Sequence, residues 1–210
     1  MAEQTLEIFD TTLRDGGQSE SISFSVEDKL ALVDALDQLG VDYIEGGWPG
    51  ANPRDDAFFE AARDRRRHHA RLLAFGSTMR PGGSPETDPV LQGLLGAEPE
   101  GVVIFGKAWD LHVELGLGIA PEANLELIRD SVAYMKARTE RVIFDAEHFF
   151  DGYKGHPDYA LQVLAAATEG GADRLVLCDT NGGALPSEIG QGGDAVQRHC
   201  PGAGIGIHCH

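Results

Sequence analysis

Residues 6–18 read LEIFDTTLRDGGQ, a short apolar run that leads directly into carboxylates, hydroxyls, a guanidinium and two glycines. The apolar run predicts a strand, and the polar residues after it predict a functional loop at the end of that strand. A polar turn is the alternative, in which Gly16 and Gly17 only supply positive φ angles. The far end of the chain favours the functional loop.

Residues 204–210, GIGIHCH, place His208 and His210 two positions apart in a predicted strand. Side chains two residues apart point to the same face of a strand, so both imidazoles can converge on one point. With a carboxylate from the opening stretch they make the start of a divalent-metal site. These residue types suit Mg, Mn, Zn or Co alike, so the identity of the metal stays open.

The chain has 210 residues and a formal net charge of −17, from 34 acidic and 17 basic side chains. Nucleic acids and anionic membranes bind basic surfaces, so neither is an expected partner. The three cysteines include no C-x-x-C pair, which favours a reducing cytoplasm over a disulfide framework or a zinc ribbon. No apolar run approaches about 20 residues and no basic-then-apolar leader is present, so we expect neither a membrane span nor an export segment.

Strand-like apolar runs recur along the chain at intervals of roughly 30 to 40 residues, about the length of one βαβ step. These seven runs are residues 6–9, 43–45, 71–75, 102–105, 141–144, 174–178 and 204–208. Apolar residues at helical spacing lie between them, at 26–36, 125–135 and 161–167. Ser25 and Gly40 are the expected cap and stop of the first helix. Strict alternation of strand and helix predicts a parallel sheet covered by helices.

Chemically active residue types follow nearly every predicted strand. They include Asp10 to Asp15, Glu45 to Trp48, Gly76 to Thr78, Gly106 with Lys107, Asp145 to His148, Cys178 to Asn181, and His208 with His210. In a (β/α)₈ barrel all carboxyl ends of the strands ring one pocket, whereas an open sheet uses only those near its switch point. Neither G-x-G-x-x-G nor a P-loop follows any strand. We therefore predict a (β/α)₈ TIM barrel, truncated after about seven strands because such barrels typically need about 250 residues.

Four motifs in this order resemble the isopropylmalate/homocitrate/citramalate synthase family, a family of metal-dependent condensing enzymes. They are Asp10–Gly16, Tyr43–Pro53, Phe144–Tyr153 and His208–His210. The likeness runs over the whole chain and points, within the family, to citramalate synthases of the long bacterial type. It implies a TIM-barrel acyltransferase that condenses acetyl-CoA with pyruvate or a similar 2-oxo acid and releases CoA. The implied product is (R)-citramalate or a homologue, as in isoleucine or leucine biosynthesis, in a cytoplasmic enzyme that is a homodimer when full length.

The resemblance also implies roles for individual residues. Asp15, His208 and His210 match the residues that hold the divalent metal. Arg14 matches the residue that contacts the keto acid and the developing oxyanion. Substrate contacts are implied for Gln18 and Thr180 as well, and Glu147 is implied to be catalytic.

Chemistry supports these roles independently of the resemblance. A cation chelated by a 2-oxo acid makes C2 more electrophilic, and Arg14 supplies fixed positive charge at the same oxygen. Removal of a proton from the acetyl methyl group requires a base, for which Glu147 and His148 are both candidates. The alternatives are structural: Asp15 could cap a helix turn or pair with Arg14, and Glu147 or Thr180 could be ordinary polar residues at strand ends.

Two departures from the family pattern stand out. Gly17 occupies a position where many relatives carry Glu, and the chain stops at His210, where relatives continue into an eighth strand and C-terminal regions. We therefore expect residues 1–210 to be an incomplete catalytic domain that is inactive, or nearly so, in isolation. The alternative functions are a metal-dependent aldolase or lyase of the same barrel type and a non-catalytic truncated paralogue.

Overall fold

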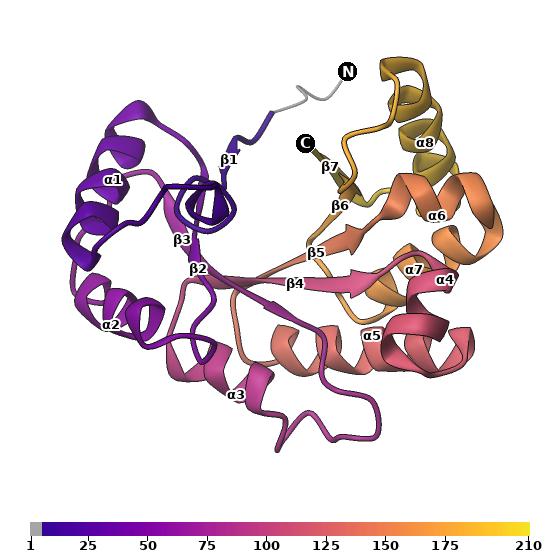
Figure 1. Cartoon of the computed structure of the whole chain (residues 1–210), viewed down its shortest axis with the longest axis horizontal. Helices are drawn as coiled ribbons and strands as arrows, with labels where there is room; N and C mark the ends of the chain where they lie inside the picture. Colours follow the sequence, from indigo (N-terminus) through magenta and orange to yellow (C-terminus); the bar gives the residue numbers. More distant parts are fainter. Residues whose placement is uncertain (1–5) are drawn as a thin grey trace. The chain divides into compact units, whose positions relative to one another are not determined.

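The computed structural model describes residues 6–210, which form two compact units of strands and helices (Figure 1). The first unit comprises Met1–Gly76 and Gly93–Val102, and the second comprises Ser77–Gln92 and Val103–His210. Residues 1–5, which the predicted domain 1–210 includes, lie outside the described part of the chain. The prediction of one incomplete catalytic domain therefore stays a prediction.

The first unit alternates parallel strands with helices. Its elements are β1 (Phe9–Asp10), the 3₁₀ turn η1 (Gly16–Gln18), α1 (Val26–Leu39), β2 (Tyr43–Gly47), α2 (Pro53–Ala62) and β3 (Arg71–Ser77). β2 pairs in parallel with both β1 and β3. α1 and α2 contact each other and β2. This is the strand and helix alternation that the sequence predicts.

α1 begins and ends where the sequence predicts. The Ser25 hydroxyl accepts from the Asp28 N–H at 3.1 Å, and the Asp28 carboxylate accepts from the Ser25 N–H at 2.9 Å, which together form a capping box. Gly40 ends the helix with a φ of 87°, in the left-handed region that a residue without a Cβ adopts without steric cost. The predicted cap and stop are therefore confirmed.

The first predicted strand, residues 6–9, is wrong in its bounds, because β1 comprises only Phe9–Asp10. Leu6 is 89% exposed and Ile8 is 54% exposed, so neither apolar side chain is buried among the described residues. The N–H of Ile8 donates to the carboxylate of Asp42 at 2.7 Å, a side-chain bond in place of a ladder bond. Regular pairing therefore starts later than the apolar run does.

The second unit contains the remaining strands in chain order. They are β4 (Gly101–Lys107), whose first two residues belong to the first unit, β5 (Arg141–Glu147), β6 (Arg174–Asp179) and β7 (Gly204–Cys209). The helices between them include α5 (Pro121–Lys136), α6 (Phe149–Gly155), α7 (Pro157–Glu169) and α8 (Pro186–His199). β6 pairs in parallel with both β5 and β7. Two shorter segments are α4 (Asp110–His112) and the π-helical η2 (Val113–Leu117), while α3 (Pro89–Gly96) is divided between the two units.

The predicted helical patterns at 125–135 and 161–167 lie within α5 and α7, which confirms both helices. Both begin at a proline, which suits the first turn because its missing N–H would have no helical partner. Among residues 6–210, no helix combines the length and the apolar character needed to cross a bilayer.

One face of β5 packs against the helices of its unit. Phe144 is fully buried, and Gly106 on β4 leaves the space that its ring occupies, since a Cβ there would lie 2.9 Å from the ring. Ile128 of α5 closes the same space. Burial of such a side chain contributes about 1.5–3 kcal/mol. Because side chains alternate along a strand, Asp145 and Glu147 lie on the opposite face of β5.

We predict that Gly152→Ala destabilises the second unit by about 1–3 kcal/mol, because α6 lies directly against the end of β4. A Cβ at Gly152 would lie 2.3 Å from the carbonyl oxygen of Ala108, which is backbone and cannot rotate away. Gly155→Ala in the same helix is the control, since its nearest neighbour would be 3.6 Å away. Urea unfolding of the two variants measures the difference, and equal stabilities would contradict the packing described.

Candidate active site

Glu147 at the end of β5 forms an ion pair with Lys107 at the end of β4. A carboxylate oxygen of Glu147 lies 2.5 Å from the ammonium nitrogen of Lys107, and each side chain is 25% exposed. The two side chains form a partly solvated ion pair. A carboxylate at the end of a strand can act as a proton acceptor.

His148, the next residue, has an unusual backbone conformation. Its φ is 56° and its ψ is 33°, a left-handed conformation that is uncommon for residues other than glycine. Its N–H donates to Oγ1 of Thr180 at 3.0 Å, so Thr180 holds this conformation from the end of β6. The hydroxyl proton of Thr180 can still be donated to a ligand.

The ring of His148 is oriented by a carboxylate. Its Nδ1 lies 2.9 Å from Oδ2 of Asp151, and the side-chain amide of Asn181 donates to the same oxygen at 3.0 Å. An ionised carboxylate can only accept hydrogen bonds, so the proton of a neutral His148 lies on Nδ1 and Nε2 carries the lone pair. His148 is therefore arranged as a second proton acceptor beside Glu147.

Two aromatic side chains from α4 and its N-terminal flank complete this cluster. The rings of His112 and His148 meet edge to face with centroids 4.5 Å apart, and Trp109 lies 4.6 Å from His112. Burial is the main cause that lowers the pKa of His112, and the nearby Lys107 ammonium and the protonated form of His148 lower this pKa further. His112 is therefore neutral at neutral pH and lines the site without adding charge.

The imidazoles at the end of β7 stack on one side of the strand. The ring centroids of His208 and His210 are 4.9 Å apart and the ring planes differ by 15°. This confirms that the two side chains share a face, as their spacing predicts. Two neutral imidazoles that lie side by side fit a divalent cation as ligands, and neighbouring carboxylates would complete such a donor set.

In the first unit, Arg14 is fixed by three contacts. Its Nε donates to Oε2 of the buried Glu45 at 2.5 Å, and its Nη1 lies 3.3 Å from Oδ1 of Asp15. The guanidinium carbon lies 3.9 Å from the centre of the Phe75 ring, a cation–π contact. Arg14 is thus held rigidly while terminal N–H groups remain for a ligand.

The structure bears on the structural alternatives for the opening loop, residues 10–18, which are a glycine turn and a helix cap or ion pair at Asp15. Gly16 and Gly17 do not have positive φ angles, so that explanation of the glycine pair is wrong. Asp15 precedes η1, but its side chain makes no capping hydrogen bond there, whereas its expected ion pair with Arg14 is present. The carboxylate of Asp15 is therefore not consumed as a helix cap.

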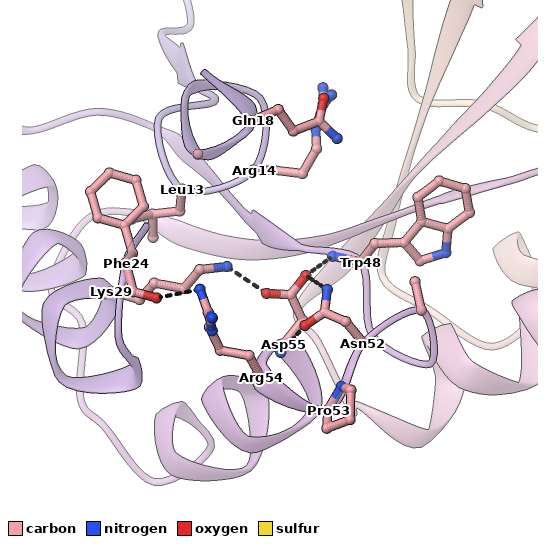
Figure 2. A pocket seen from close by; sticks show the side chains of 12 residues that line it. Leu13, Arg14, Gln18, Phe24, Lys29, Trp48, Asn52, Pro53, Arg54 and Asp55 are labelled. Carbon is pink, nitrogen blue, oxygen red and sulfur yellow. Dashed lines mark hydrogen bonds and ion pairs between the residues drawn. The ribbon is translucent and has the colours of Figure 1, made fainter. Parts of the chain in front are cut away.

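A pocket of about 670 Å³ in the first unit lies beside Arg14 (Figure 2). Gln18, Phe24 and Trp48 are also among its lining residues, and Gln18 is exposed. Arg14 and Gln18, the predicted substrate residues of the opening loop, therefore line a hollow. Both charged and aromatic groups border this space.

A buried ion pair forms one wall of the same pocket (Figure 2). The ammonium of Lys29 lies 2.6 Å from Asp55 and donates to the carbonyl of Gly46 at 2.8 Å. The second oxygen of Asp55 accepts from the N–H of Trp48 at 2.8 Å, and a Cβ at Gly47 would collide with this carboxylate. The pair fixes the loop after β2, and the sequence reasoning missed it because Lys29 occupies an ordinary helix position.

The predicted site residues fall into two groups. Arg14, Asp15 and Gln18 belong to the first unit, and Glu147, Thr180, His208 and His210 belong to the second. Within the second unit, Glu147 and Thr180 both lie beside His148. Glu147 precedes it in the chain, and Thr180 accepts a hydrogen bond from its N–H. The metal set of Asp15 with the two histidines stays a prediction. The sequence placed Asn181 at a strand end and Asp151 in a motif, but it did not indicate that the two residues orient His148.

Residues 5–210 match the sequence model of the family described as HMGL-like. The chain belongs to this family. The match to the HMGL-like family model covers nearly the whole chain and includes residues of both units.

Curated relatives specify the branch of the HMGL-like family. An (R)-citramalate synthase of Aquifex aeolicus is 53% identical over 100% of this chain and 40% of its own length. That of Geobacter sulfurreducens is 51% identical over 98% of this chain and 39% of its own length. The predicted resemblance is thereby confirmed, and the chain spans about two fifths of the length of these relatives.

Solved structures support the fold. The HMG-CoA lyase of Bacillus subtilis superposes with a TM-score of 0.78 at 20% identity, covering 99% of this chain and 69% of the lyase. Together with the seven parallel strands, this confirms the predicted (β/α)₈ fold class with about seven strands. At this identity the superposition carries the fold and not the reaction.

We predict that Lys107→Met raises the pKa of His112 toward its ordinary value. The positive charge of Lys107 opposes protonation of His112, and its removal leaves the nearby carboxylates to favour the imidazolium. NMR titration of the histidine ring signals measures the shift. Lys154→Met is the matched control, because Lys154 pairs with Glu188 and does not act on His112. An unchanged His112 midpoint in Lys107→Met would contradict the described charge coupling.

Proposed function

We propose that this chain carries the catalytic residues of an acyltransferase that condenses acetyl-CoA with pyruvate, or a close 2-oxo acid, to give (R)-citramalate. The resemblance to (R)-citramalate synthases at 53% and 51% identity supports this choice of reaction and substrates. The structural observation that carries the proposal is the stacked pair of His208 and His210 in the same unit as the oriented acid–base cluster around Glu147. Such an enzyme needs a cation site and a proton acceptor.

The proposed metal ligands are Asp15, His208 and His210, and the ion is Mg, Mn, Zn or Co. When bound, a divalent cation would polarise the 2-oxo group and stabilise negative charge on its oxygen. Arg14 is proposed to contact the same oxygen or the substrate carboxylate through its terminal N–H groups, with Glu45 holding it in place. Gln18 and Thr180 are the proposed hydrogen-bonding partners of the keto acid.

Glu147 is proposed to take a proton from the methyl group of the acetyl thioester. The resulting carbon nucleophile forms a bond to C2 of the keto acid, and the carbonyl oxygen gains the electron pair and then a proton. Water cleaves the thioester, so that CoA leaves as the free thiol. Lys107 would hold the carboxylate of Glu147 in position through their ion pair, and His148 with its lone pair on Nε2 is the alternative acceptor.

We predict that a chimera, in which this chain replaces the matching segment of the Aquifex aeolicus relative, releases CoA from acetyl-CoA only when pyruvate or a similar 2-oxo acid is present. Mass spectrometry of the product checks that citramalate forms. Glu147→Gln in the chimera should lower kcat by about 100-fold or more, because the proton acceptor is lost. Glu169→Gln, at an exposed surface ion pair, should leave kcat unchanged.

Other outcomes assign the chemistry differently. A folded chimera that only cleaves 2-hydroxy or 2-oxo acids would contradict the condensation and indicate the aldolase or lyase alternative. A folded but inactive chimera would favour the non-catalytic paralogue. A larger loss in His148→Gln than in Glu147→Gln would contradict Glu147 as the proton acceptor.

A further inference from the structure

A row of three different metal-binding side chains lies in the second unit, and two of them, Asp145 and His208, stand two residues before Glu147 and His210 in the chain. Asp145 of β5, Cys178 of β6 and His208 of β7 each offer one donor atom, and these atoms all lie within 4.8 Å of one another. Asp145 is 4% exposed and Cys178 is 7% exposed. Carboxylate, thiol and imidazole thus converge in a largely buried place.

The sheet itself sets this convergence. Cys178 and His208 are register partners in the parallel pair of β6 and β7, so their side chains leave the sheet side by side. Asp145 is the register partner of Val176, which is two residues before Cys178 and on the same face. The three donors therefore meet because of strand pairing, without depending on a loop.

The donor types select a particular class of cation. Thiolates favour thiophilic ions such as Zn²⁺ and Cd²⁺, whereas carboxylate and imidazole alone also accept Mg²⁺ or Mn²⁺. Zinc binds sulfur at about 2.3 Å and nitrogen or oxygen at about 2.0–2.2 Å, so donors 4.8 Å apart or closer need only small side-chain rotations to share one ion. Three protein ligands leave a fourth position for water.

We propose that Asp145, Cys178 and His208 form a second cation site, selective for thiophilic divalent ions such as Zn²⁺ and Cd²⁺. This site shares His208 with the metal set of the proposed function, so a thiophilic ion bound here draws His208 away from that set. A thiophilic ion that occupies this second site instead of the proposed metal set is then an inhibitor of the enzyme. Only this consequence rests on the proposed function; the site itself rests on residues of one unit.

Titration of the reduced, purified chain with Cd²⁺ tests the site, with the near-ultraviolet thiolate-to-cadmium absorption as the readout. We expect one ion per chain and a band that Cys178→Ser abolishes, with affinity lowered about tenfold or more. Asp145→Asn should weaken binding while it keeps the band. Cys200→Ser, a second buried thiol, and Cys209→Ser, an exposed one, are the matched controls and should bind as the wild type does.

A band that persists in Cys178→Ser, or that disappears in Cys209→Ser, would overturn the site. Unchanged affinity in Asp145→Asn would contradict Asp145 as a ligand of the site. Circular dichroism checks the fold of each variant. If Cys178→Ser does not fold, protection of Cys178 from alkylation by Cd²⁺ in the wild-type chain, read by peptide mapping, decides instead. Absence of Mn²⁺ binding alongside a normal Cd²⁺ response would contradict the proposed function and leave this site intact.

Discussion

Parallel pairing in fixed register is the constraint on which the chemistry of the second unit depends. Side chains two residues apart lie on one face, and register partners lie side by side, so the polar residues near the ends of β5, β6 and β7 can meet only on the face away from the helices. Phe144 occupies the helix face, which leaves Asp145 and Glu147 on the other. A register shift of one residue would exchange these faces and remove the site.

Polar groups that leave water must find partners, and this requirement shapes both units. Glu45 is fully buried and accepts from Arg14, and Lys29 is buried with Asp55. Removal of one partner would leave an uncompensated buried charge, which costs several kcal/mol. These pairs fix the loops after β1 and β2 in a single geometry, which a substrate-binding loop requires.

Periodicity and caps made most of the fold predictable from the sequence. Ser25, Asp28 and Gly40 delimit α1 through local hydrogen bonds and backbone conformation, and such interactions depend on few residues. α8 was not predicted, because its segment 186–199 carries three glycines that obscure the helical pattern, although Gly192 is needed where Phe150 packs closely. The early start assigned to β1 failed because hydropathy does not report where pairing partners begin.

The candidate site was predictable where it depended on spacing and not where it depended on contacts. Alternation alone indicated that His208 and His210 share a face. The orientation of His148 by Asp151, and the support of its strained backbone by Thr180, join residues from two loops, and nothing in the spacing of these residues indicates the contact. Cys178 stands among the chemically active residue types at the end of its predicted strand, but the sequence did not pair it with Asp145 and His208, because a single cysteine in a strand has the pattern of a small apolar residue.

The central claim is that one cation is held by a carboxylate from the opening loop and two imidazoles from the last strand. Anomalous X-ray scattering from crystals of the chain grown with Mn²⁺ tests it most directly. The account predicts a single anomalous peak coordinated by Asp15, His208 and His210. A peak elsewhere, or one bound by the histidines with Asp15 turned away, would contradict it.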